Sequence, residues 1–134
     1  MVEAASGIVI LYDYLWAHQA DRGEESGRKS RPCCVHIMLR NERGTVSALF
    51  PISSRPAAGR LALEIPDTEL RRIGLSAGSW VLVDEWNLDD LALSPHVADP
   101  NPLGTFSAAF MRRIRTAALE ALRNRSYRSV PRRR

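Results

Sequence analysis

The sequence predicts a mainly-β protein, a small and strongly bent antiparallel barrel or half-barrel with one C-terminal α-helix. Several short apolar runs, rich in β-branched and aromatic residues, are separated by turn-forming residues. Only residues 106–124 repeat apolar side chains at helical spacing over a long stretch. The length of 134 residues suits one domain. We therefore expect a single domain over residues 1–124 and a basic, disordered tail over residues 125–134.

The N-terminal half contains three predicted strands and one long polar loop. Residues 7–16 form a run of aliphatic and aromatic side chains that predicts the first strand. Residues 17–30 are charged and almost free of apolar side chains, which predicts a surface loop, and loops of this length often carry function. The second strand is expected at 31–39 and the third at 45–52, joined by a hairpin turn at 41–44.

The C-terminal half predicts three shorter strands and two helices. Strands are expected at residues 61–65, 79–84 and 88–93. A short helical turn begins at Pro66 and ends at Gly74, with proline and glycine in the positions that favour a helix start and stop. Thr105 is the predicted N-cap of the long helix, whose apolar stripe faces the sheet.

The charge is distributed unevenly along the chain. The net charge is +4, but from Arg112 onward nine arginines and one acid, Glu120, give +8, so the preceding residues carry −4. A basic helix and tail of this kind attract RNA through its phosphates or dock an acidic protein segment. For residues 132–134 the simpler interpretation is a solvated tail with no specific partner.

Composition also excludes several classes of protein. No apolar run reaches the roughly 20 residues of a membrane helix, and no signal peptide is recognisable, so no membrane association is expected. The two cysteines, Cys33 and Cys34, are adjacent, which disfavours both a mutual disulfide and a metal site. These features predict a reduced, cytoplasmic protein without metal or other cofactor.

The order of several motifs resembles a known family. The polar loop ends in Gly27-Arg28-Lys29-Ser30-Arg31-Pro32, and the third strand ends in Pro51-Ile52-Ser53-Ser54. Gly74-Leu75 and Ser79-Trp80-Val81 follow before the closing helix. Over roughly residues 6–122 this order resembles the MazF/PemK family of toxin endoribonucleases from type II toxin–antitoxin pairs.

The resemblance implies a fold, an activity and partners. It implies an SH3-like or PemK-like barrel that forms a homodimer and cleaves single-stranded RNA, including mRNA, without a metal. Such a protein is a growth-inhibiting toxin neutralised by a cognate antitoxin. By resemblance, Arg31 is the catalytic arginine and Ser53 occupies the place of a threonine that positions the scissile phosphate. Asp84 occupies the place of an acidic residue proposed to accept a proton.

The residue types fit this chemistry. In metal-free RNA cleavage the 2′-OH of the substrate attacks the phosphate, and the protein supplies proton transfer and charge stabilisation. An arginine such as Arg31 holds two phosphate oxygens at once, and a hydroxyl such as Ser53 donates one further hydrogen bond. The products implied by the resemblance are a 2′,3′-cyclic phosphate and a 5′-OH end. The candidates for the base are His18, Glu24, Glu25 and Asp84.

Further residues are candidates for contact with the RNA chain. We expect RNA contacts from Arg28, Lys29, Ser54, Arg55 and Trp86. Trp86 is the tryptophan best placed to stack on a base or to join an interface, while Trp80, inside an alternating strand, is expected in the core.

Alternative interpretations exist for each residue and for the function. Arg31 is alternatively a surface cation paired with loop acids, Ser53 a turn residue, and His18 a solvated loop histidine. The function is alternatively that of a non-catalytic RNA- or protein-binding module that uses the surface between Arg31 and Trp86. A gyrase-poisoning toxin is a third possibility, since a related toxin family shares the barrel.

Overall fold

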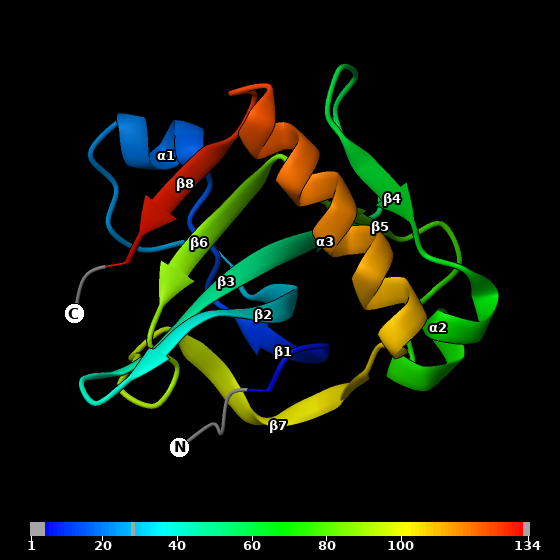
Figure 1. The fold of residues 1–134 in the computed structure, drawn as a ribbon, viewed down its shortest axis with the longest axis horizontal. Helices are drawn as coiled ribbons and strands as arrows, with labels where there is room; N and C mark the ends of the chain where they lie inside the picture. The colour runs from blue at the N-terminus through cyan, green and yellow to red at the C-terminus, as the bar shows by residue number, and fades with distance from the viewer. Residues whose placement is uncertain (1–4, 28, 133–134) are drawn as a thin grey trace.

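The fold is mainly β with one long helix, as predicted, in a computed structural model that describes residues 5–27 and 29–132 (Figure 1). The elements in chain order are β1 (Ile8–Tyr12), α1 (Ala17–Asp21), β2 (Arg31–Asn41), β3 (Gly44–Ser53), β4 (Ala62–Glu64), α2 (Asp67–Ile73), β5 (Trp80–Leu82), β6 (Glu85–Asp89), β7 (Val97–Thr105), α3 (Ala108–Arg123) and β8 (Arg128–Pro131). No helix within the described residues is long and apolar enough to cross a membrane.

The strands form one bent, open sheet. The order along it is β4-β5-β3-β2-β1-β7, and β6 joins at β3 and pairs with β8. All neighbours are antiparallel except β6 and β8, which run parallel. Within the described residues no ladder joins the end strands β4 and β7, so the sheet does not close on itself.

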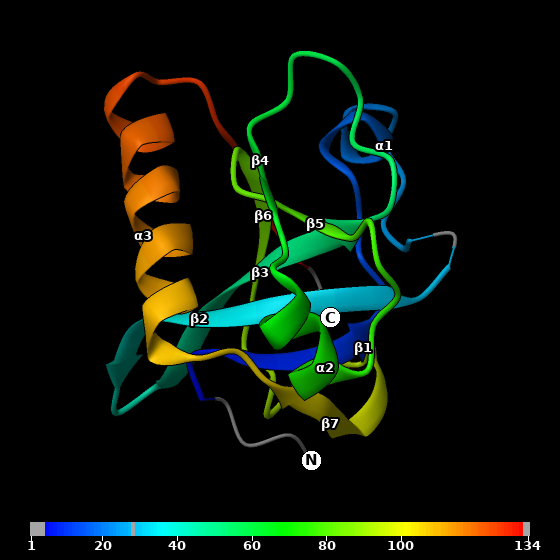
Figure 2. The same ribbon diagram turned by 90° about the vertical axis from the view of Figure 1, so that its right-hand side faces the viewer.

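Side chains on the two faces of the central strands form two separate hydrophobic clusters. The first cluster packs against α2 and α3 and includes Val9, Cys34 and Phe50. The second lies on the other face and includes Ile10, Cys33 and Leu49. Figure 2 shows α3 on one side of the sheet and α1 on the other. Because side chains alternate along a strand, this division fixes the face to which each residue of β1, β2 and β3 points.

The long helix starts later than predicted. Its N-cap is Ser107, whose hydroxyl accepts a hydrogen bond from the Phe110 N–H at 3.1 Å. The prediction of Thr105 as the cap is wrong because Thr105 ends strand β7. That strand was not predicted, since Pro100 and Pro102 interrupt its pattern. Among the described strands it pairs with β1 alone, and an edge strand tolerates proline.

Three other boundaries differ from the prediction. The polar loop at 17–30 begins with the short helix α1. The strand predicted at 79–84 is the shorter β5, and the strand predicted at 88–93 begins earlier, as β6. Only Val83 and Asp84 separate the two strands in the sequence. The hairpin at 41–44 is confirmed, because Asn41 pairs with Gly44 across a two-residue turn.

The prediction of a disordered tail is wrong for most of its length. Strand β8 pairs in parallel with β6, with Glu85 opposite Arg128 and Leu88 opposite Pro131 (Figure 1). Val130 is buried in a small apolar cluster with Leu15. The tail is therefore ordered through Arg132, whose side chain is fully buried.

Candidate functional site

Arg31 lies at the start of β2 as a half-buried cation that has no acidic partner among the described residues. It pairs with Tyr12 of β1, and its guanidinium carbon lies 4.9 Å from the centroid of the Trp16 ring. Its Nε is buried and has no hydrogen-bond partner within the described residues. The same part of the chain contains no ion pair from Arg31 to a loop acid, which was the alternative interpretation. An aromatic ring therefore holds the cation and leaves its hydrogen bonds available.

Ser53 lies at the same end of the β2–β3 ladder as Arg31. The ladder pairs Val35 with Leu49 and ends with Cys33 opposite Pro51. Continuing the same register by two residues on each strand brings Arg31 opposite Ser53. Both side chains point to the face of the second hydrophobic cluster, away from α3. The Ser53 hydroxyl oxygen accepts a hydrogen bond from the Arg55 N–H at 3.2 Å, so the hydroxyl hydrogen remains a donor.

The pairing extends this pair into a row across five strands. Ser53 is paired with Trp80 of β5, and Trp80 is paired with Glu64 of β4. Directly opposite residues of antiparallel strands share a face, so one face carries Tyr12, Arg31, Ser53, Trp80 and Glu64 in that order. Sequence reasoning missed Trp80 and Glu64 as members of the site. Their only signal is the strand register, which joins segments that are distant in the chain.

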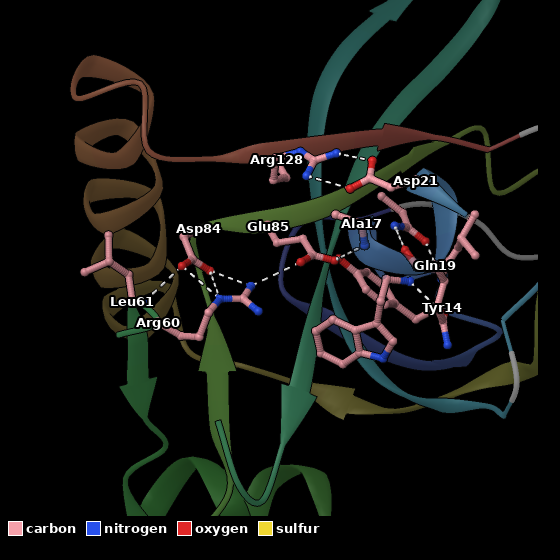
Figure 3. Close-up of polar contacts among 12 residues, drawn as sticks. Tyr14, Ala17, Gln19, Asp21, Arg60, Leu61, Asp84, Glu85 and Arg128 are labelled. Carbon is pink, nitrogen blue, oxygen red and sulfur yellow. Dashed lines mark hydrogen bonds and ion pairs between the residues drawn. The ribbon is translucent and has the colours of Figure 1, made fainter. Parts of the chain in front are cut away.

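A buried network of hydrogen bonds fixes the position of Trp16, the aromatic residue that packs against Arg31. The Trp16 ring packs edge-on against Tyr14 with ring centroids 4.9 Å apart. Glu85 Oε2 accepts hydrogen bonds from the Tyr14 hydroxyl at 3.0 Å and from the Ala17 N–H at 2.8 Å (Figure 3). Burial, followed by the charge of Glu85, raises the pKa of Tyr14 well above its ordinary value, so this hydroxyl stays a donor. The start of α1 and Trp16 are thereby fixed.

Asp84 is part of the same network and is fully engaged by Arg60. Figure 3 shows Arg60 between the carboxylates of Asp84 and Glu85. Arg60 Nε lies 3.1 and 3.0 Å from the two Asp84 oxygens, Nη2 lies 2.8 Å from one of them, and the Leu61 N–H adds a bond at 3.1 Å. The hydrogen bonds to Asp84 raise the pKa of Arg60. Both oxygens of Asp84 are therefore occupied by donors from Arg60 and Leu61, which gives this carboxylate a structural role in joining the Arg60 loop to β6. Its predicted role as a proton acceptor stays a prediction.

The remaining predicted residues lie at the margin of the row. His18 is exposed on α1, two residues beyond Trp16. Lys29 is exposed in the loop before Arg31, and Ser54 and Arg55 are exposed after Ser53. Arg28 lies outside the described residues.

The prediction that Trp86 contacts RNA is wrong. Its side chain is only 3% exposed and belongs to the cluster under α3. Tyr127 stacks on its ring at 5.2 Å with nearly parallel planes, and the Phe50 ring lies 5.5 Å away. Trp86 also packs on the face of the sheet opposite to Arg31, so it is remote from the row.

In the part of the chain that the structure describes, neither a metal-ligand cluster nor a reactive thiol adds to this site. The described residues contain no group of three or more His, Cys, Asp or Glu side chains that could hold a metal ion. Cys33 and Cys34 are free and buried, and burial raises the pKa of both thiols far above the ordinary value. Buried thiols of this kind are unreactive packing residues.

A separate apolar groove of about 810 Å³ lies between α3 and the sheet. Phe50, Phe106 and Met111 are among its apolar lining residues, while Arg112 and Arg115 supply positive charge. No acidic side chain lines it within the described residues. The groove is on the opposite face from Arg31 and Ser53, so it forms a second surface.

Comparison with protein-family models, with curated proteins and with solved structures finds no match to this chain. The resemblance to the MazF/PemK family therefore remains a prediction based on the motifs, and the geometry of the row has to carry any functional proposal.

Proposed function

We propose that the protein is a metal-independent endoribonuclease for single-stranded RNA, acting as the growth-inhibiting toxin of a toxin–antitoxin pair. One observation carries the proposal. Arg31 is a half-buried arginine without an acidic partner among the described residues, and the strand register sets it opposite the hydroxyl of Ser53 on one face. A cation and a hydroxyl donor side by side match a phosphate that gains negative charge.

In the proposed reaction, the substrate 2′-oxygen attacks the adjacent phosphorus and the bond from phosphorus to the 5′-oxygen breaks. Arg31 donates two hydrogen bonds to the non-bridging oxygens, which carry extra charge in the transition state. Ser53 donates one more. The 2′-OH loses its proton to a base and the leaving 5′-oxygen gains one, so the products are a 2′,3′-cyclic phosphate and a 5′-OH end.

For the base we propose His18. It is exposed on the short helix that begins next to Trp16, whose ring packs against Arg31. Imidazole exchanges protons near neutral pH, which suits this step. Asp84 is a weaker candidate because Arg60 and the Leu61 N–H occupy its oxygens.

The proposal also includes the specific fold type and the partners that the resemblance implies. These are an SH3-like or PemK-like arrangement of the strands, a homodimer, and a cognate antitoxin. The groove under α3 supports the antitoxin as a partner, since its apolar floor and its arginines Arg112 and Arg115 suit an acidic segment with apolar side chains.

The test is incubation of purified protein with a long RNA in EDTA. Wild-type protein is expected to cleave the RNA, and Arg31→Ala is expected to be at least 100-fold slower because one charge-stabilising donor group is lost. Arg43→Ala is the matched control, since Arg43 is an exposed arginine in the turn at the opposite end of the same hairpin. Equal cleavage by Arg31→Ala and wild type contradicts the proposal.

The second candidate function is a non-catalytic RNA-binding module on the same surface. The Arg31 guanidinium favours this function as strongly as it favours catalysis, because binding of a phosphate needs no base. Retention of RNA without any cleavage in EDTA or in Mg²⁺ would support this function instead.

A further inference from the structure

We infer that Trp80 is a base-stacking residue for the single-stranded RNA, one position along the row from the phosphate held by Arg31 and Ser53. This inference rests on the proposed function, because it takes the phosphate at Arg31 as its reference point. It replaces Trp86, whose ring is covered, as the tryptophan that contacts a base.

The strand register places Trp80 next to the phosphate position. Trp80 is the direct partner of Ser53 in the β3–β5 ladder, and Ser53 lies between Trp80 and Arg31 in the row. Neighbouring strands are about 4.8 Å apart, so about 10 Å separates the backbones that carry Arg31 and Trp80. The side chains share a face, and a nucleotide with its phosphate on Arg31 can therefore reach the Trp80 ring with a base.

The Trp80 ring is also the one tryptophan ring with no aromatic or cationic partner among the described residues. Trp16 carries the Arg31 guanidinium and packs against Tyr14, and Trp86 is stacked on Tyr127. Trp80 is half-buried and belongs to none of the hydrophobic clusters in that part of the chain. A partly exposed indole at a strand start, with no aromatic or cationic partner in that part of the chain, suits stacking with a base.

The support for the ring is rigid. Strand β5 is paired on both sides, since Val81 lies opposite Ile52 of β3 and opposite Leu63 of β4. A platform fixed before binding loses little conformational entropy when a base stacks on it. The next residue in the row, Glu64, is an exposed carboxylate. It repels phosphate, so the row is cationic on the Arg31 side and aromatic and acidic on the other. This asymmetry places the RNA backbone over Arg31 and a base over Trp80.

The test separates binding from cleavage. The probe is a single-stranded oligoribonucleotide with 2′-O-methyl groups at all positions, which cannot supply the attacking hydroxyl. Its affinity is measured by fluorescence anisotropy for wild type, Trp80→Leu and Trp80→Phe, with a melting curve for each variant. Trp80→Leu is expected to bind about 5- to 100-fold more weakly, and Trp80→Phe within about threefold of wild type, because stacking needs an aromatic face.

A second measurement distinguishes stacking from a merely structural role. One abasic site is moved along the oligonucleotide, and each position is measured with wild type and Trp80→Leu. At one position the abasic site is expected to lower the affinity of wild type strongly and that of Trp80→Leu hardly at all, because the abasic site and the substitution remove the same contact. Additive losses at every position, or equal affinity of wild type and Trp80→Leu, overturn the inference. The proposed function fails separately, if unmodified RNA is not cleaved or if Arg31→Ala cleaves it normally.

Discussion

Arg132 is the residue whose replacement tests the C-terminal part of the fold most sharply. Its Nη1 donates hydrogen bonds to the Asp13 carbonyl and to Asn87 Oδ1 at 3.1 Å, and its Nη2 donates to the Glu25 carbonyl at 3.4 Å. The guanidinium also lies 5.3 Å from the Tyr12 ring centroid. One side chain therefore joins the end of β1, strand β6 and the loop that leads to Arg31.

Arg132→Met keeps the length of the side chain and removes these donors. Hydrogen bonds from charged groups contribute about 1.5–3 kcal/mol each, and the cost of burying the charge offsets part of this. We expect the free energy of unfolding to fall by about 2–4 kcal/mol, and the melting temperature to fall by about 8–15 °C for a chain of this size.

The assay is urea unfolding followed by circular dichroism, and the matched control is Arg128→Met. Arg128 lies on the same strand but pairs with Asp21 at the surface, where both side chains are 55% exposed (Figure 3). Exposed pairs contribute little, so the control is expected to unfold close to wild type. If Arg132→Met unfolds at the same urea concentration as wild type, the tail is solvated and the reasoning is refuted.

Three further predictions concern the site and its surroundings. Ser53→Ala is expected to slow RNA cleavage about 10- to 100-fold while Ser53→Thr stays near wild type, and equal rates for all three proteins would remove Ser53 from the mechanism. Asp84→Asn is expected to lower the urea midpoint, because it weakens the ion pair with Arg60, and to leave cleavage per folded molecule unchanged. A large loss of kcat without a loss of stability would instead identify Asp84 as the base. Burial and then Arg115 lower the pKa of His36 below its ordinary value of 6.5, so the unfolded chain binds the proton more readily. Stability is therefore expected to fall as the pH drops below about 6.5, less so in His36→Asn, and an identical pH profile for that variant would contradict this.

The sequence predicted those parts of the fold in which local pattern and tertiary environment agree. The helical period that predicts α3 is the stripe that packs on the sheet, with Phe110 and Ile114 buried. The turn at Asn41–Gly44 forms because its residues suit a hairpin. Strand β7 was missed because prolines conceal an edge strand, and β8 because its stability comes from β6 and from a buried Arg132.

The site was predictable only in part, for a related reason. The motifs single out Arg31 and Ser53, but only the register of β2 with β3 sets them opposite each other. The place of Trp80 depends on a further ladder that joins β3 to β5. The ion pair of Asp84 with Arg60 was not predictable, because Arg60 lies in a loop with no sequence pattern that links the two.

The central claim is that Arg31 stabilises charge on a phosphate attacked by the substrate's own 2′-OH. The most direct measurement is single-turnover cleavage in EDTA of an oligoribonucleotide containing a mapped cleavage site, with and without a single 2′-deoxy substitution at that site. Wild type is expected to produce 2′,3′-cyclic phosphate and 5′-OH ends from the unmodified strand alone. Arg31→Ala is expected to be at least 100-fold slower, and Arg31→Lys slower than wild type because lysine cannot bind two oxygens with a planar fork. Cleavage of the 2′-deoxy strand, or an undiminished rate in Arg31→Ala, would contradict the claim.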